Sequence, residues 1–425
     1  MLKKTIALVL LLSLLLGATA MAEVTNRDMQ LMGGVVVTNS TDAFFFCPME
    51  SGITGHWGLY ALSSVAEGPI LDIKNGYPAR LVHADEENVY FLGYTDAGRT
   101  VHTLYSVNIA TGENAELVTN ISSAFVGESD VILFVKADEL YTLYSYNITK
   151  RQETKIKDMS ASNKKIYDAG IYNGGTYFIT KADSGGAEDG YEYHESSGKA
   201  TNLDKPSPAV YTGLLYEGYR LYSANREGDP QIYAMRIGNK KSERIGTSYN
   251  VSLTNPRFGN MMYAYDSDKG ELVALPLDAS AAKSLALDTG IVSRLVLGGS
   301  KDELLLLGND EVYSIKPDLS GQTKLFDFDT GTGGQLWTVV APAKDAILLM
   351  GYGQETFTHQ NSMLPTAVYV IDRATGEQLF GFPEWDPENP TVEDRPEAIG
   401  DIPRDDAGEE GEGAGTYFIW DDAEG

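Results

Sequence analysis

Cysteine is nearly absent from this 425-residue sequence. Cys47 is the only one, so no disulfide can form within the chain. A chain without disulfides depends on a large hydrophobic core, and this chain is long enough to build one. Cys47 ends the apolar run Phe44-Phe45-Phe46-Cys47, which predicts a buried thiol rather than a reactive one.

Residues typical of catalytic and cofactor sites are also scarce. There are five histidines, and no two of them have the spacing of a zinc-ligand pair. No Gly-x-Ser-x-Gly motif and no glycine-rich phosphate loop occurs, so serine hydrolysis and nucleotide binding have no support. The sequence therefore predicts no cofactor and favours a protein that is not an enzyme.

Positive charge is in short supply. The chain carries 33 Lys and Arg against 60 Asp and Glu, a formal net charge of −27. Phosphate-rich partners require clustered Lys and Arg, so nucleic acid and anionic lipid are not expected to bind.

Much of the negative charge lies in residues 383–425, where proline recurs and the acidic side chains outnumber Arg395 and Arg404 by fifteen to two. We expect a largely disordered acidic tail there, with a short strand over 416–420 as its one ordered segment.

Long apolar runs are absent except at the N-terminus. Lys3 and Lys4 precede an apolar run from Ile6 to Leu16, and Ala20-Met21-Ala22 follows it. This run is shorter than the ~20 residues that span a bilayer, and the layout is typical of a secretory signal peptide. Residues 1–22 are therefore predicted to be removed, which leaves a secreted or cell-surface protein with no membrane span.

What the sequence does contain is a repeat over residues 23–382. Short β-prone segments are separated by Gly, Asp, Asn and Ser, and each repeat carries an aliphatic-Tyr pair or a degenerate copy of it. The equivalent positions are Tyr60, Tyr105, Tyr144, Tyr191, Tyr233, Val273, Tyr313 and Tyr369. Their spacing of about 40–50 residues predicts an all-β fold, a β-propeller of eight four-stranded blades, with seven blades as the alternative.

The repeat resembles a known family. Asn88-Val89-Tyr90-Phe91-Leu92 followed by Thr103-Leu104-Tyr105-Ser106-Val107, and the later segment 316–325, are similar to the repeats of lipoprotein-receptor-like and TolB-like propellers. In secreted Firmicutes proteins this propeller domain has no known function. The resemblance implies a propeller and an extracellular setting but no activity. Gly93-Tyr94-Thr95-Asp96 only approaches the Tyr-Trp-Thr-Asp motif of the receptor propellers.

Long loops between second and third strands indicate where a ligand could bind. Such loops are predicted at 48–57, 182–190 and 353–365, and the first and last of them become neighbours when the ring closes. An exposed aromatic beside imidazoles and amides suits a glycan or peptide. The candidate ligand-binding residues are His56, Trp57, Phe357, His359, Gln360 and Asn361. The alternative is that Trp57 and Phe357 only pack their own loops.

Calcium is the one metal that the sequence suggests. Acidic residues stand close together near glycine in two turns, with Asp183, Glu188 and Asp189 in one and Asp266 and Asp268 in the other. Neither turn supplies the six to eight oxygens that calcium needs, and Asp and Gly also form ordinary turns.

These observations leave three functions open. The first is a monomeric extracellular binding propeller that recognises a cell-envelope glycan or protein through its loop face. The second is a secreted propeller enzyme, of lyase or lactonase type, which predicts acidic, His or Arg side chains converging at the mouth of the channel. The third is a rigid platform whose acidic tail carries the interaction.

Overall fold

The computed structural model describes residues 36–382, except for gaps at 50–55, 75–76, 95–100, 127–129, 184–187, 204–211, 227–228, 240, 247–250, 252, 254–255, 267–268, 288–295, 300–301, 309–310, 329–335, 341–344, 353–364 and 366. The predicted signal peptide (1–22), the acidic tail (383–425) and its strand (416–420) lie outside this part and stay predictions. Within it, no helix has the length and apolar character to cross a membrane.

The first half of the described chain forms two sheets. The first holds β1 (Val36–Thr38), β2 (Ala43–Pro48), β3 (Trp57–Ala61) and β4 (Leu71–Ile73). The second has seven strands: β5 (Tyr77–Ala84), β6 (Asn88–Tyr94), β7 (His102–Asn108), β8 (Asn114–Val126), β9 (Val131–Lys136), β10 (Glu139–Asn147) and β11 (Gln152–Asp158). Two 3₁₀ helices, η1 (Leu62–Glu67) and η2 (Ser160–Ser162), lie in connections.

The rest forms five four-stranded sheets. They are β12 (Lys164–Tyr172), β13 (Gly175–Ala182), β14 (Asp189–His194) and β15 (Lys199–Asn202); β16 (Thr212–Tyr216), β17 (Tyr219–Arg226), β18 (Asp229–Arg236) and β19 (Glu243–Arg244); β20 (Arg257–Phe258), β21 (Met261–Asp266), β22 (Glu271–Pro276) and β23 (Lys283–Ala286); β24 (Val296–Gly299), β25 (Leu304–Gly308), β26 (Glu311–Ile315) and β27 (Gln322–Asp327); and β28 (Leu336–Val340), β29 (Ala346–Tyr352), β30 (Ala367–Asp372) and β31 (Gln378–Phe382).

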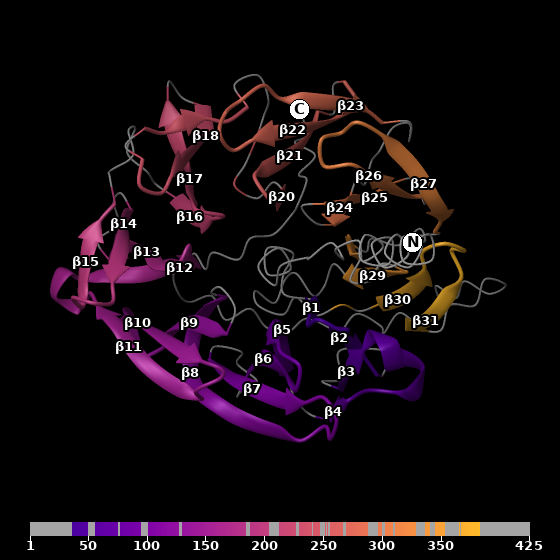
Figure 1. Ribbon diagram of the computed structural model, residues 1–425, viewed down its shortest axis with the longest axis horizontal. Helices are drawn as coiled ribbons and strands as arrows, with labels where there is room; N and C mark the ends of the chain where they lie inside the picture. Colours follow the sequence, from indigo (N-terminus) through magenta and orange to yellow (C-terminus); the bar gives the residue numbers. More distant parts are fainter. Residues whose placement is uncertain are drawn as a thin grey trace, which may run out of the picture.

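The sheets stand around a central axis, as Figure 1 shows. In every sheet the strands are antiparallel and follow one another in sequence order. The first strand of each sheet is the innermost and the last is the outermost. This arrangement is a β-propeller, so the predicted all-β propeller fold is confirmed.

Strand β8 decides how many blades are counted. Its first part pairs with β7 and its second part with β9, and Ile121 is paired on both sides. The change of partner occurs at Asn120, whose φ of 62° bends the strand. Counted as one strand, β8 gives seven sheets, and counted as two it gives eight four-stranded units. We number the units 1 to 8 in chain order, with β8 shared by units 2 and 3.

The recurrent tyrosines lie on the third strand of their units, opposite a residue of the second strand. In five units that residue is aromatic and the two rings stack, with centroids 5.1–5.9 Å apart. These pairs are Phe45–Tyr60, Phe91–Tyr105, Phe134–Tyr144, Phe178–Tyr191 and Tyr222–Tyr233. Stacked aromatic pairs stabilise a sheet by more than the area that they bury accounts for. Here they give the middle of these five units a similar thickness.

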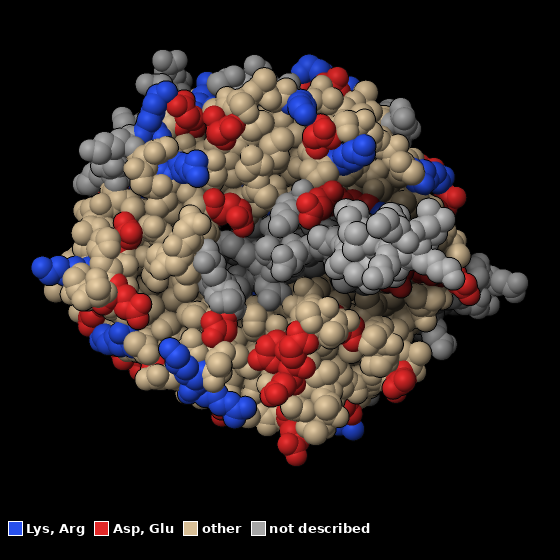
Figure 2. Space-filling model, viewed as in Figure 1, with Lys and Arg blue, Asp and Glu red and all other residues tan. Residues whose placement is uncertain are grey.

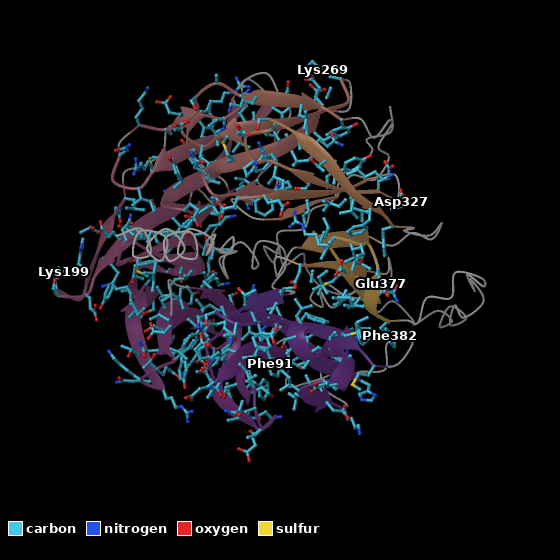
Figure 3. All side chains as sticks on the ribbon, turned by 45° about the vertical axis from the view of Figure 1, so that its right-hand side comes forward. Phe91, Lys199, Lys269, Asp327, Glu377 and Phe382 are labelled. Carbon is cyan, nitrogen blue, oxygen red and sulfur yellow. The ribbon has the colours of Figure 1, made fainter. Side chains whose placement is uncertain are left out.

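Burial falls from the axis outward along each sheet. Strands β2 and β22, in the middle of their sheets, are almost wholly buried, whereas the outermost strands β11, β15 and β23 are mostly exposed. In Figure 3, Phe91 lies among the packed side chains, while Lys199 and Lys269 stand at the periphery. Lysines on outer strands, such as Lys155 and Lys199, discourage another chain from pairing with the open edge.

The ring closes by side-chain packing between unit 1 and unit 8. Strand β2 contacts β30, η1 contacts β31, and the rings of Tyr60 and Phe380 lie 5.4 Å apart. Cys47 lies in the same core cluster, fully buried, and burial raises the pKa of its thiol. Among the described strands, none from unit 1 joins the sheet of unit 8.

Phe178 tests the importance of the ring pairs for stability. Replacing it with alanine (Phe178→Ala) removes a fully buried ring and its stacking partner's contact, so the free energy of unfolding should fall by about 3–5 kcal/mol. Denaturant unfolding measures this change. The control Lys199→Ala, on an exposed outer strand, should stay within about 0.5 kcal/mol of the parent. Equal losses in both variants would contradict the role given to the pair.

Candidate functional site

A pocket of about 480 Å³ lies where units 5, 6 and 7 meet, on one face of the ring. Each unit brings to this face its A–B turn, between first and second strands, and its C–D turn, between third and fourth strands. The pocket is lined by Glu217, Tyr219, Phe258, Gly259, Asn260, Met261, Asp302, Pro317 and Asp318.

Tight turns hold the lining residues in place. The A–B turn of unit 5 is only Glu217-Gly218, with φ of 46° and 74°, and that of unit 6 is Gly259-Asn260, with φ of 56° at the glycine. Two-residue connections of this kind fix the direction in which the hairpin end points. The C–D turn of unit 7 is also held, because the Tyr263 hydroxyl donates to the carbonyl oxygen of Pro317 over 3.0 Å.

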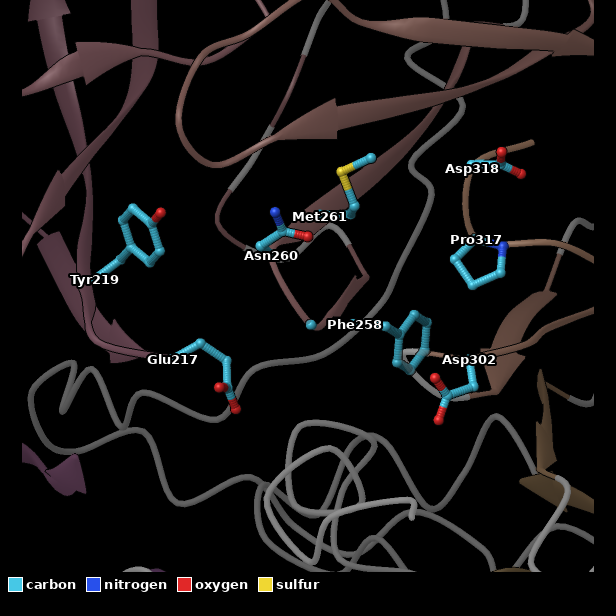
Figure 4. Close-up of a pocket in the computed structure, with 9 residues that line it drawn as sticks. Glu217, Tyr219, Phe258, Asn260, Met261, Asp302, Pro317 and Asp318 are labelled. Carbon is cyan, nitrogen blue, oxygen red and sulfur yellow. The ribbon is translucent and has the colours of Figure 1, made fainter. Parts of the chain in front are cut away.

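The pocket combines apolar surface with carboxylates. Phe258 forms a buried floor, and Met261 and Tyr219 are half-buried beside it. In Figure 4 the carboxylate of Asp302 lies beside the Phe258 ring, that of Glu217 lies well to its left, and both point towards the centre of the propeller.

The third carboxylate, Asp318, lies beyond Pro317 and away from the other two. Hydrogen bonds from the hydroxyl and backbone N–H of Ser320 lower the pKa of Asp318, and Lys283 Nζ stands 3.8 Å from its Oδ2. Asp318 is thus engaged by its own turn and by a lysine.

The A–B turns of the whole ring share this acidity. Every charged residue that the structure describes in them is acidic: Asp42, Asp85, Glu86, Glu87, Asp130, Glu217, Asp302, Glu303 and Asp345. Lys301 and Lys344 also belong to these turns by sequence, but they lie outside the described residues. Figure 2 shows acidic side chains close to the central region of the face that it presents.

Some of these acids serve the turns themselves. Asp42 accepts a hydrogen bond from the backbone N–H of Ser63 at 3.0 Å, and Asp85 accepts one from the Tyr90 hydroxyl at 2.8 Å. Arg373 pairs with Glu303. The acidic turns therefore have a structural role as well as an electrostatic one.

Two of the residues predicted from the long loops are described. His56 Nε2 lies 2.7 Å from Oδ1 of Asp72, on the outermost strand β4 of unit 1. Trp57 is half-buried and packs against the core cluster shared by units 1 and 2. Both side chains have neighbours that hold them in place. The other four, Phe357, His359, Gln360 and Asn361, lie outside the described residues, so this predicted site stays a prediction.

The predicted calcium ligands are found in two different settings. Asp183 and Asp266 pair with lysines, with Lys165 Nζ at 2.9 Å and Lys269 Nζ at 2.5 Å respectively. Asp189 lies 2.5 Å from Lys164 Nζ. Asp268 lies outside the described residues, and within them no three His, Cys, Asp or Glu side chains gather in a metal-binding arrangement. Calcium binding stays a prediction.

Glu188, the remaining predicted ligand, is buried between units 4 and 5. Glu188 is only 7% exposed. Burial raises the pKa of its carboxyl group to about 7, although the nearby positive charge of Arg220 acts in the opposite direction. The backbone N–H of Gly213 donates to the carboxyl group, and the Arg220 guanidinium donates to the backbone oxygen of Glu188 over 3.0 Å. Oε2 has no hydrogen-bond partner among the described residues, which fits a protonated carboxyl.

A side chain at position 213 would disturb the interface between units 4 and 5. A Cβ on Gly213 would stand 3.2 Å from Oε2 of Glu188 and 3.1 Å from the Leu221 carbonyl oxygen, so glycine allows the carboxyl to approach the inner strand. Arg220 and Tyr219 are adjacent on β17 and point to opposite faces of the sheet, one to this interface and the other to the pocket.

A second group with a shifted pKa, the half-buried His102, lies near the junction of units 2 and 3. Burial and the nearby Arg80 lower the pKa of His102 to about 4, and its ring lies 4.3 Å from that of Tyr94. Arg80 donates to the backbone oxygen of Ala124 in the next unit. Glu188 and His102 therefore both lie at junctions between units, and neither of them lines the pocket.

Comparisons with known proteins add little beyond the fold. No protein-family model and no curated protein matches the chain. Among solved structures, the chain is similar to the β-propeller domain of the Trilobed protease from Pyrococcus furiosus (11% identity, 71% of this chain and 96% of that one, TM-score 0.40). It is also similar to an oligogalacturonate lyase from Vibrio parahaemolyticus (10%, 80% and 98%, 0.44) and to TolB from Acinetobacter baumannii (11%, 63% and 59%, 0.32). At these values the likenesses carry no inference about binding or activity.

The buried carboxyl of Glu188 predicts a pH dependence of stability. Because its pKa is raised from 4.5 to about 7 in the folded state, the folded protein holds this proton more tightly than the unfolded chain. The contribution of this proton to stability is complete below about pH 4.5 and is lost as the pH rises through about 7.

The variant Glu188→Gln keeps the shape of the side chain without the titration. Its free energy of unfolding relative to the parent should rise by about 3 kcal/mol between pH 4.5 and pH 8. Urea unfolding at a series of pH values measures the difference. Ser196→Ala, at an exposed turn, removes no titrating group and should give a flat difference across the same range. A flat difference for Glu188→Gln as well would show that the carboxyl titrates normally.

Proposed function

We propose that this protein is a secreted binding propeller of eight blades that recognises an extracellular protein or a cell-envelope glycan on its A–B face. The observation that carries the proposal is the pocket between units 5, 6 and 7. Its volume is within the range of ligand sites, and it combines a buried aromatic floor with a few polar groups at fixed positions.

The rigidity of the pocket supports a binding role. Glu217, Gly259 and Asn260 come from two-residue turns and Pro317 from a turn held by the Tyr263 hydroxyl, whereas Asp302 comes from the longer turn between β24 and β25. A preformed site loses little conformational entropy when its ligand binds. The signal peptide predicted from residues 1–22 supports the extracellular setting.

The alternative is a secreted lyase or lactonase with a site at the channel mouth. Glu188 favours it, because a carboxyl with a pKa raised to about 7 is suited to acid-base chemistry. However, Glu188 is almost completely enclosed and lies in the interface between units 4 and 5, away from the lining of the pocket. A structural role in joining these blades accounts for its setting.

A blocking substitution tests the pocket. Asn260 is exposed and lines the pocket, so a tryptophan there (Asn260→Trp) should fill it without disturbing the core. A ligand that binds only the folded state raises the free energy of unfolding, by about 2.7 kcal/mol at 100 times its Kd. The melting temperature rises with it. The measurement is a set of thermal melts with peptidoglycan fragments, envelope glycans and basic and acidic peptides.

At least one of these probes should raise the melting temperature of the parent, and Asn260→Trp should abolish that increase. Ser196→Trp, at an exposed C–D turn of unit 4 on the same face, should keep it. If Trp57→Ala abolishes the increase and Asn260→Trp does not, the ligand binds through the opposite loops. If no probe raises the melting temperature, the proposal is contradicted.

A further inference from the structure

We infer that the open edge of β31, the outermost strand of unit 8, binds an extended segment, and that residues 416–420 of this chain are that segment. This site is separate from the pocket, because β31 contributes none of the residues that line it. Figure 1 shows β31 at the outer rim of the ring. Three features support the pairing: the lack of charge on β31, the exposure of Leu379, and the composition of the chain that follows.

Strand β31 differs from the other outermost strands in carrying no charge. Its sequence is Gln378-Leu379-Phe380-Gly381-Phe382. Each of the other outermost strands that the structure describes contains at least one charged residue; these strands are β4, β11, β15, β19, β23 and β27. Charged side chains on an open edge discourage another strand from pairing with it. Because no described strand pairs with the second edge of β31, an incoming strand meets an edge without this protection.

Leu379 is an apolar side chain that the neighbouring unit leaves uncovered. In units 2, 3, 7 and 8 the outer strand is bulged at an aliphatic residue, namely Leu117, Ile156, Leu325 and Leu379. The first three are half-buried against a core cluster that their unit shares with the next one. Leu379 is 52% exposed, more than any other large hydrophobic residue that the structure describes. A strand added beside β31 would cover it.

The chain after β31 contains one segment suited to this edge. In residues 383–425 the only apolar run is Thr416-Tyr417-Phe418-Ile419-Trp420, which consists of the β-branched and aromatic residues that strands favour. The run has the same length as β31 and carries no charge. An added strand is held by main-chain hydrogen bonds, and its side chains cover the surface on either side of them. Tyrosine, phenylalanine and tryptophan supply the apolar surface that Leu379 lacks.

Residues 383–415 tether this segment to the edge that it would bind. A flexible linker of 33 residues has a root-mean-square end-to-end distance of about 30 Å. A five-residue strand is only about 17 Å long, so the segment can return along β31 in either direction. Such a tether keeps the local concentration of the segment on the order of a millimolar. This advantage favours residues 416–420 over a free peptide of similar composition.

Pairing at this edge would strengthen the closure of the ring. Strand β31 contacts η1 of unit 1, and the ring of Phe380 lies 5.4 Å from that of Tyr60. A strand on the open edge gives β31 hydrogen bonds on both sides, which restricts the motion of Phe380 away from unit 1. Residues 416–420 would thus act as a clasp on the last strand of the propeller.

Hydrogen–deuterium exchange of the purified protein, read by mass spectrometry, tests this site. A synthetic peptide of residues 414–422, free in solution, gives the rate for the unpaired segment. Leu379→Lys places a charge on the proposed edge, and Phe418→Pro removes a backbone donor from the segment. The matched control Thr323→Lys places the same charge on the outermost strand β27, where residue 323 is exposed.

In the parent, the amides of residues 416–420 should exchange at least tenfold more slowly than in the free peptide, because a paired amide exchanges only when the pairing opens. Leu379→Lys and Phe418→Pro should each reduce this protection to less than threefold, whereas Thr323→Lys should keep it. Exchange in the parent as fast as in the free peptide would show that the segment does not bind. Protection that survives Leu379→Lys would show that it binds elsewhere. Either result overturns the proposal.

Dilution separates the segment of the same chain from that of a second copy. The tethered segment should keep its protection over a dilution of about a hundredfold, and light scattering should show a monomer throughout. Protection that is lost on dilution, together with a dimer at high concentration, would assign the edge to the segment of a second copy and overturn the clasp within one chain. Thermal melts of Leu379→Lys and Thr323→Lys confirm that these exposed substitutions leave the propeller folded.

Discussion

The contact between neighbouring sheets is the constraint on which this fold depends. A four-stranded sheet has two apolar faces and cannot bury either of them alone, so each unit needs a neighbour on both sides. The stacked rings on second and third strands set the thickness of this contact in five units. Units 6, 7 and 8 use aliphatic residues instead, and Leu306 and Leu349 stand opposite Tyr313 and Tyr369.

The junction of units 1 and 8, which closes the ring, depends on the same contact between neighbouring sheets. Units 1 and 8 are joined by the packing of Tyr60 on Phe380 and of η1 on β31, without a shared strand among the described residues. The chain ends therefore carry no hydrogen-bonded clasp in this part of the structure. Stability must come from the apolar cluster that continues from unit 6 through units 7 and 8 into unit 1. Arginines strengthen other junctions, because the half-buried Arg80 binds a backbone oxygen of the next unit and the buried Arg220 binds one of the preceding unit.

This architecture could be predicted from the sequence because the repeated residues are aliphatic and aromatic side chains that must be buried. The tyrosines, at intervals of 39 to 56 residues when Val273 is counted with them, lie on third strands, and Val273 takes the same place in unit 6. What could not be predicted was the continuity of β8, because a bend at Asn120 and an ordinary turn have the same composition.

The candidate site was harder to predict than the fold. Attention to long loops led to His56 and Trp57, which prove to be held by Asp72 and by the core. The pocket comes instead from the shortest turns, such as Glu217-Gly218, which look like ordinary hairpin ends. Superposing the repeats would have revealed the excess of acids in the A–B turns. Glu188 was noted as a metal ligand, but no pattern in the sequence could show that Gly213 and Arg220 enclose it.

The two sides of β17 show how one strand can serve stability and recognition together. Arg220 faces unit 4 and binds the backbone of Glu188, whereas Tyr219 faces unit 6 and forms part of the pocket wall. Because alternate residues of a strand point to opposite faces, the interface that fixes β17 also fixes the wall. A ligand in the pocket would therefore meet a surface whose position is set by the packing of units 4, 5 and 6. Recognition in this propeller depends on the same contacts between sheets that hold the ring together.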